Sequence, residues 1–256
     1  TSIGSNVFWG CNSLASIDIP AAVTSIGSSA FSGCSSLASI TIPAAVTAID
    51  ATAFSGCTAI TKLTLDTPLL STVGDFVTTY FADSKGSITE LIIGDAVTSL
   101  ADKTCFECSK LKKLTIGDAV TSIGSASSDG GRVFQGCSSL DDVTLGAAVT
   151  SIGFAAFLNC GSLASIDIPT AVTSIGGHAF DGCSSLASID IPAAVTSIGG
   201  GIFFSCTSLA SIDFSAAAPK VIPDHAFYNC RSLASIDIPA SVKSIVVNAF
   251  VNCISL

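Results

Sequence analysis

The feature that most constrains the fold is a repeat marked by cysteine. Ten of the eleven cysteines recur mostly every 23 residues, with single intervals of 24, 29 and 51 residues. An eleventh position of this column falls inside the 51-residue interval, where either Ser84 or Lys85 would occupy it. A period of this length is typical of a solenoid, in which each repeat forms one turn and is stabilised by its neighbours. The ten cysteines are Cys11, Cys34, Cys57, Cys108, Cys137, Cys160, Cys183, Cys206, Cys230 and Cys253.

Each repeat carries apolar residues at fixed positions. In one copy, Leu37, Ile40 and Ile42 have the spacing of a short strand with one buried face. Pro43 ends that strand, and the ring of Phe54 fills the far side of the turn. Such side chains stabilise by about 1.5–3 kcal/mol each when buried, but only a neighbouring turn can cover them. We therefore expect a mainly β solenoid of about eleven turns, with parallel strands on one face and short turns or helical corners.

The period runs through the whole sequence, so we expect residues 1–256 to form a single solenoid with one continuous core. Residues 67–87 and 125–132 depart from the repeat and are interpreted as irregular insertions. Thr1 and Leu256 both lie in the middle of a repeat, which favours a segment of a longer chain.

The composition excludes several classes of protein. The sequence is 49% hydrophobic, so it can bury a core and is not disordered. Its net charge of −9 disfavours a nucleic-acid partner, which requires a basic surface. Polar residues interrupt every apolar stretch well before the length of a transmembrane helix, so no membrane span is expected.

A longer motif identifies a known family. The string L-x-x-I-x-I-P-x-x-V-x-x-I-G-x-x-A-F-x-x-C runs from Leu14 to Cys34 and again from Leu163 to Cys183. It resembles the 23-residue leucine-rich repeat of the BspA-like family, and the resemblance covers essentially the whole sequence. It implies a leucine-rich-repeat solenoid on a secreted or surface-anchored protein. The implied function is non-enzymatic adhesion to, or binding of, a protein ligand such as a host or matrix protein.

A second function stays open beside adhesion. The solenoid ends carry no polar capping repeat, so end-to-end self-association would build a structural subunit of an extracellular filament or surface layer. Electron microscopy would separate the two hypotheses, because only the second predicts ordered polymers without an added ligand.

Charged residues break the repeat in the middle of the chain. Most copies have Ala-Ser at the two positions before the strand isoleucine, and this pair requires no function. Charged departures from it favour a recognition surface, whereas sequence drift is the alternative. The candidate ligand-binding residues are Lys62, Glu90, Lys112, Lys113, Asp141 and Asp142.

An aspartate ladder is expected nearer the C-terminus, at the outward position between the last two strand isoleucines. It consists of Asp167, Asp190, Asp213 and Asp237. Carboxylates stacked about 5 Å apart repel each other, so the ladder is either a solvated acidic stripe or a weak site for a cation or a basic ligand. Calcium requires six or more oxygen ligands, so no metal is assigned.

The thiols and histidines give no catalytic motif. The cysteine column is expected to pack as small buried side chains. Cys105 replaces the phenylalanine and forms C-F-E-C with Cys108, where a local disulfide and free thiols are both open. His178 and His225 have no nucleophile and acid arranged around them by a recognisable motif, so they are interpreted as solvated corner residues. We expect no enzyme, no catalytic residue and no cofactor.

Overall fold

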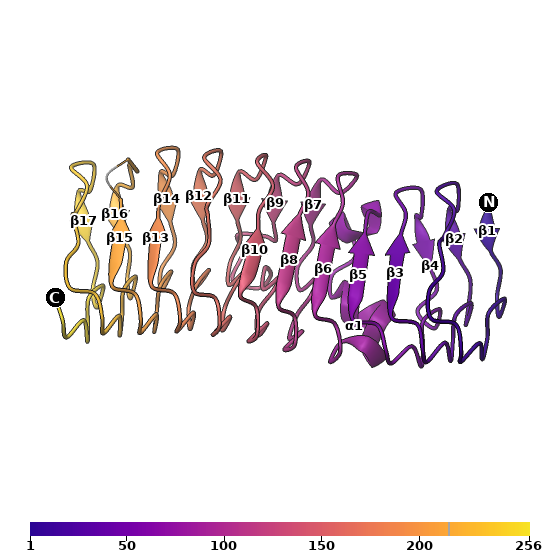
Figure 1. Cartoon of the computed structure of the whole chain (residues 1–256). Coiled ribbons are helices and arrows are strands. Elements are labelled where there is room, and N and C mark those ends of the chain that lie inside the picture. Colours follow the sequence, from indigo (N-terminus) through magenta and orange to yellow (C-terminus); the bar gives the residue numbers. More distant parts are fainter. Residues whose placement is uncertain (215) are drawn as a thin grey trace.

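The computed structural model describes residues 1–214 and 216–256 and confirms the expected solenoid of parallel strands. The turns stack side by side in one row, and the two termini lie at its opposite ends (Figure 1). Every strand pair is parallel and in register with the equivalent residues of the next turn, as Ile40 with Leu63. Long-range order in this fold therefore comes from pairing between consecutive turns.

The first strand column is formed by the strands that the apolar spacing predicts. Its five-stranded sheet has the order β10-β8-β6-β5-β3, and a two-stranded sheet pairs β13 with β15. The chain leaves each long strand just before the corner, as β3 does before Pro43. The bounds are β3 (Ser39–Ile42), β5 (Lys62–Leu65), β6 (Glu90–Ile93), β8 (Lys113–Ile116), β10 (Asp142–Thr144), β13 (Ser188–Asp190) and β15 (Ser211–Asp213).

A second strand column adds to the single face that the sequence predicts. Its strands are two residues long and follow the corner, where the Val46 amide donates to the Pro43 carbonyl over 3.0 Å. They form three sheets, which contain three, five and two strands. The bounds are β1 (Ser2–Ile3), β2 (Ser25–Ile26), β4 (Ala48–Ile49), β7 (Ser99–Leu100), β9 (Ser122–Ile123), β11 (Ser151–Ile152), β12 (Ser174–Ile175), β14 (Ser197–Ile198), β16 (Val221–Ile222) and β17 (Ser244–Ile245).

The helices of the described chain all lie in the insertion at residues 67–87. They are η1 (Pro68–Ser71), α1 (Phe76–Phe81) and η2 (Ala82–Ser84). The same segment resolves the missing cysteine position, because Ser84 is buried and its hydroxyl donates to the Cys57 carbonyl. Ser84, and not Lys85, thus continues the cysteine column. Residues 125–132 form a loop without helix or strand.

Phenylalanine rings stack along the axis of the core. The rings form two runs, with centroids of neighbouring rings 4.7–5.8 Å apart. Cys105 occupies the same column between the runs and interrupts them. The rings are Phe8, Phe31, Phe54 and Phe81 in the first run, and Phe134, Phe157, Phe180, Phe203, Phe227 and Phe250 in the second.

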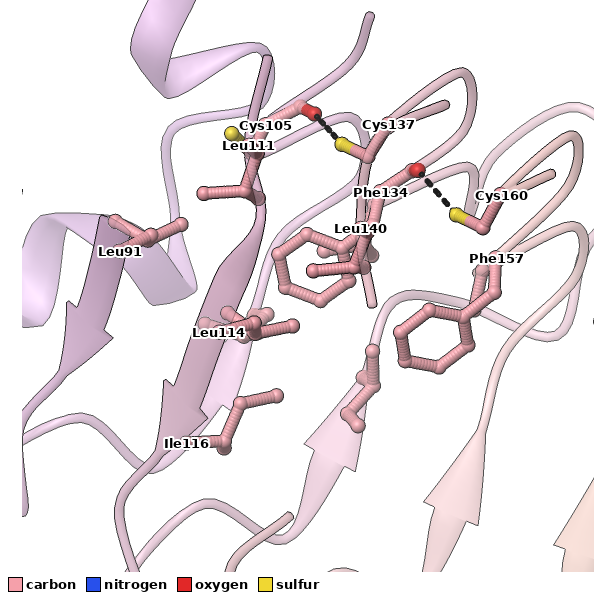
Figure 2. Packing of buried hydrophobic residues seen from close by; sticks show 14 of the residues in the cluster. Leu91, Cys105, Leu111, Leu114, Ile116, Phe134, Cys137, Leu140, Phe157 and Cys160 are labelled. Atoms are coloured by element: carbon pink, nitrogen blue, oxygen red, sulfur yellow. Dashed lines mark hydrogen bonds between the residues drawn. The ribbon is translucent and has the colours of Figure 1, made fainter. Parts of the chain in front are cut away.

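The cysteine column joins most turns to the turn before them. The Cys137 thiol donates to the Cys105 carbonyl and the Cys160 thiol to the Phe134 carbonyl, both over 3.3 Å (Figure 2). All eleven cysteines lie in the described chain, and all are free thiols. Of the two alternatives for C-F-E-C, the structure has the free thiols, because Cys105 and Cys108 are both buried and neither forms a disulfide.

Burial controls the ionisation of most of these thiols. Loss of hydration raises the pKa of Cys57 and of Cys230 to about 12. Cys108 differs, because the hydrogen bond from the neighbouring Cys105 thiol lowers its pKa below the usual thiol value. Since Cys57, Cys108 and Cys230 are buried, access of a reagent rather than ionisation limits their reactivity.

Removal of one ring from the stack should destabilise the protein strongly. Phe180 is fully buried between Phe157 and Phe203, at centroid distances of 5.7 and 5.8 Å. We expect Phe180→Ala to lower the free energy of unfolding by about 3–5 kcal/mol in urea denaturation, because it leaves a cavity. Trp9→Ala is the control, since Trp9 is 68% exposed and its loss should change stability little. Equal stability of the two variants would contradict this description of the core.

Thiol labelling should follow the same burial. Cys11 is exposed and Cys253 half-buried, whereas the other nine cysteines are buried. We expect mass spectrometry after brief iodoacetamide treatment of the native protein to find label on Cys11, less on Cys253, and on the other nine only after unfolding. Rapid labelling of Cys137 or Cys183 in the folded protein would contradict the buried column.

Candidate functional site

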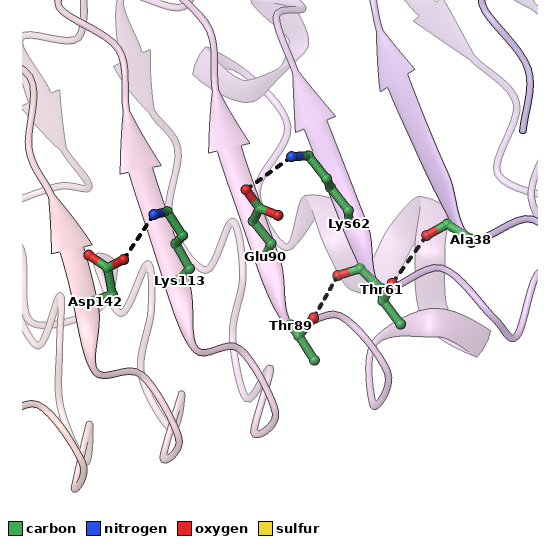
Figure 3. Close-up of polar contacts among 7 residues, drawn as sticks. All are labelled: Ala38, Thr61, Lys62, Thr89, Glu90, Lys113 and Asp142. Carbon is green, nitrogen blue, oxygen red and sulfur yellow. Dashed lines mark hydrogen bonds and ion pairs between the residues drawn. The ribbon is translucent and has the colours of Figure 1, made fainter.

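Four of the six candidate binding residues form one row across the first strand column. The register pairs Lys62 with Glu90, Glu90 with Lys113, and Lys113 with Asp142. Within this charged row, Lys62 Nζ lies 3.1 Å from Glu90 Oε1 and Lys113 Nζ lies 3.0 Å from Asp142 Oδ2 (Figure 3). The structure therefore brings together residues that are up to 80 positions apart in sequence, in alternating order of charge.

Lys112 and Asp141 lie next to the charged row because the backbone is bulged where these strands begin. The amides of Lys112 and Lys113 both donate to the Thr89 carbonyl, over 2.9 and 3.0 Å. The amides of Asp141 and Asp142 share the Lys112 carbonyl in the same way. Both residues of each of these two pairs are exposed. Lys112 and Asp141 form no ion pair within the described chain.

The charged row is nearly neutral as a unit. Each cation has an anion in the adjacent turn, and the hydrogen bond from Lys113 to Asp142 raises the pKa of Lys113. Both members of that pair are about half exposed, at 51% and 52% of their side-chain surface. Exposed ion pairs contribute little to stability because water screens them. The row can therefore exchange its internal pairs for contacts with a ligand at low cost.

The aspartate ladder lies on the same strand column. Asp190 and Asp213 are register partners in β13 and β15, and a shallow groove on each side adds Asp167 or Asp237 to them. All four side chains are exposed. In the part of the chain that the structure describes, no three His, Cys, Asp or Glu residues are grouped so that they could hold a metal ion. The arrangement fits a solvated acidic stripe, and cation binding there stays a prediction.

The two histidines lie half-exposed at the corner that precedes the phenylalanine column. His178 Nδ1 lies 2.9 Å from Asp181 Oδ2, and His225 Nδ1 lies 3.4 Å from Asp224 Oδ2. In the described chain, neither imidazole forms a hydrogen bond to a serine, threonine or cysteine side chain. The geometry thus offers no hydroxyl or thiol that either imidazole could activate.

Aromatic side chains surround these histidines, and the sequence analysis missed them. Phe154 meets the His178 ring edge to face at 5.6 Å, and Phe204 stacks on Tyr228 at 4.6 Å and lies 6.2 Å from the His225 ring. For Phe154 a signal was present in the sequence, because most other copies have serine, alanine or glycine at the equivalent position.

Asp181 should make stability depend on pH. Burial raises its pKa above the usual value, so the folded state binds the proton more tightly than the unfolded chain. Stability contributed by this group is therefore present at low pH and falls as pH rises through its raised pKa. We expect Asp181→Asn to be more stable than the unsubstituted protein at pH 7, because the amide oxygen can still accept from His178 and carries no charge.

The advantage of Asp181→Asn should shrink as pH approaches about 4, the usual aspartate pKa. Urea denaturation at several pH values measures it, with the exposed Asp190→Asn as the matched control. A variant that is less stable than the unsubstituted protein at pH 7 would contradict the assignment.

Comparison with known proteins agrees with this geometry. A family model described as "BspA type Leucine rich repeat region (6 copies)" matches residues 1–127 and 127–256. The chain is 30% identical to the T. pallidum leucine rich repeat protein TpLRR, over 68% of this chain and 79% of that one, with a TM-score of 0.61. A leucine-rich repeat protein from Bacteroides ovatus is 26% identical over 100% of this chain and 68% of its own, also with a TM-score of 0.61.

No protein with a curated description matches the chain. The described residues contain no helix that is both long and apolar enough to cross a membrane. The matching family model describes a repeat scaffold rather than a catalytic domain. Because that model matches both halves of the sequence, the chain belongs to the BspA-type leucine-rich-repeat family.

Proposed function

We propose that this protein is a non-enzymatic binding module, outside the cell or at its surface, and that it presents the first strand column to a protein ligand. The observation that carries the proposal is the charged row together with Lys112 and Asp141. These residues interrupt an otherwise uniform Ala-Ser surface at one place, and all of them lie on one strand column. Solenoids commonly use such extended faces for binding.

The chemistry of this face suits a protein partner. Alternating charges give a pattern that a partner can match in register, which favours specificity over strength of attraction. Lys112 and Asp141 are exposed and form no ion pair with any residue that the structure describes, so they can contact a ligand without breaking one. The aspartate ladder continues the same column toward the C-terminus and would favour a partner with a basic segment.

An extracellular location is compatible with the thiol chemistry. Oxidising compartments convert accessible thiol pairs into disulfides. Here nine of the eleven cysteines are buried, and their thiols are protected by the packed turns. The resemblance of the repeats to those of secreted and surface-anchored proteins supports the same location.

Exchange of charges between adjacent turns tests the binding face. The variant Lys112→Asp, Lys113→Asp, Asp141→Lys and Asp142→Lys keeps the net charge and preserves an ion pair between the adjacent strands. We expect it to fold normally by circular dichroism and to lose at least about tenfold in affinity for a matrix protein such as fibronectin in surface plasmon resonance, since several contacts reverse sign.

The matched control exchanges Lys110→Asp and Asp129→Lys, two exposed residues outside the strands. It should bind fibronectin like the unsubstituted protein. If the fourfold exchange left a measurable affinity unchanged, the charged row and its neighbours would not be the binding surface. If the unsubstituted protein did not bind fibronectin, this matrix protein would be excluded as the ligand.

A further inference from the structure

A recess of about 430 Å³ opens at the corner before the phenylalanine column and spans four successive turns. Glycines form its floor and aromatic, imidazole and carboxylate side chains form its walls. A volume of this size accommodates a small ligand or one long side chain. The lining residues are Phe154, Gly177, His178, Gly200, Gly201, Phe204, Asp224 and His225.

The glycines let neighbouring side chains approach the backbone of this corner closely. His178, Gly201 and His225 occupy the same corner position in three successive turns, all with a left-handed backbone at φ of 54°, 62° and 54°. Glycine adopts this conformation most easily, and the His178 ring packs against it, since a Cβ added to Gly201 would lie 2.5 Å from His178 Cε1. A Cβ added to Gly200 would lie 2.6 Å from Asp224 Oδ1, so the carboxylate lies directly over the floor of the recess.

The walls offer acceptors and very few donors. The Asp224 side chain is 58% exposed, and its one ion-pair contact in the described chain is His225 at 3.4 Å. The lining contains no Lys, Arg, Ser, Thr, Asn or Gln, so the imidazoles supply its only side-chain N–H groups. A ligand that brings its own donors and a positive charge therefore suits the side chains of this recess.

The aromatic walls add a preference for a planar cation. Tyr228 stacks on Phe204 with an angle of 5° between the rings, which leaves the opposite face of Phe204 toward the preceding turn. A guanidinium group is planar, carries five N–H donors and stacks on aromatic faces, whereas an ammonium group lacks this planar fork. The chain already shows such a contact, because the Arg132 guanidinium carbon lies 5.4 Å from the centroid of the Phe154 ring.

We infer that this recess binds an arginine side chain of a protein partner, with Asp224 as the acceptor and Phe204 as the stacking surface. The inference rests on the proposed function, because it names the chemistry of a protein ligand. It uses none of the residues of the charged row. The net charge of −9 favours the approach of a cationic segment to any part of this chain.

Titration with a capped peptide tests the inference. The probe is acetyl-Gly-Arg-Gly-amide, and NMR follows the imidazole signals of His178 and His225 in the full chain. We expect saturable shifts with this peptide and none with the isosteric neutral peptide that carries citrulline. Asp224→Asn should weaken binding by at least about tenfold, because it removes a charge-assisted hydrogen bond. Asp190→Asn changes the net charge equally at a distant exposed site and should leave the affinity unchanged.

Several results would overturn the inference. Equal binding of the citrulline peptide, or an Asp224→Asn affinity like that of the unsubstituted protein, would exclude guanidinium recognition. Shifts with methyl glucoside and none with the arginine peptide would reassign the recess to a carbohydrate.

The fourfold charge-exchange variant separates this test from that of the proposed function. It should bind the arginine peptide normally even though it binds fibronectin poorly. If the unsubstituted protein did not bind the arginine peptide, while its binding of fibronectin still depended on the charged row, only the inference about the recess would be wrong.

Discussion

Contact between consecutive turns is the interaction on which the whole structure depends. No turn can bury its own phenylalanine, leucine and isoleucine side chains, because the covering surface belongs to the next turn. The ring stack, the thiol-to-carbonyl hydrogen bonds and the parallel strand pairs all join one turn to its neighbour. The corner glycines reflect the same closeness, since a Cβ on Gly176 would lie 2.6 Å from the Gly153 carbonyl carbon.

This constraint separates structural from functional positions. Inward positions must repeat, because each must fit the same position of the next turn. Outward positions are free to differ, so recognition has to be encoded there. The charged row and the arginine recess both lie at outward positions where this chain departs from its own repeat. The two sites differ in kind. The charged row has long side chains on a strand surface where other copies have serine, whereas the recess has glycines at a corner.

Much of the fold could be predicted, because the 23-residue period determines where the strands and corners lie. The apolar spacing located strand β3, and Pro43 marked its end. The second strand column was not predicted, because two-residue strands such as Ser25–Ile26 are too short to show alternation. The choice between Ser84 and Lys85 required the structure, since the insertion before them shifts the register.

The candidate site could be predicted only in part. The sequence supplied the members of the charged row as departures from Ala-Ser, but the ion pair of Lys62 with Glu90 depends on a register that spans the insertion. The recess was not predicted, because the turn itself explains a glycine at a corner. Which side chains surround these glycines becomes visible only when the neighbouring turns are aligned. Its walls come from four different repeats, and none of them is conspicuous alone.

Deletion of one full period tests most directly the claim that equivalent turns stack through interchangeable inward positions. Removal of residues 35–57 takes out one 23-residue repeat that contains neither the charged row nor the recess. It joins Cys34 to the residue that follows Cys57, the equivalent cysteine of the next copy. We expect a folded protein with a native-like circular dichroism spectrum and cooperative urea unfolding, whereas deletion of residues 35–46 should abolish folding because it breaks the register. Loss of folding on removal of the full period, or equal tolerance of both deletions, would show that the turns are not interchangeable.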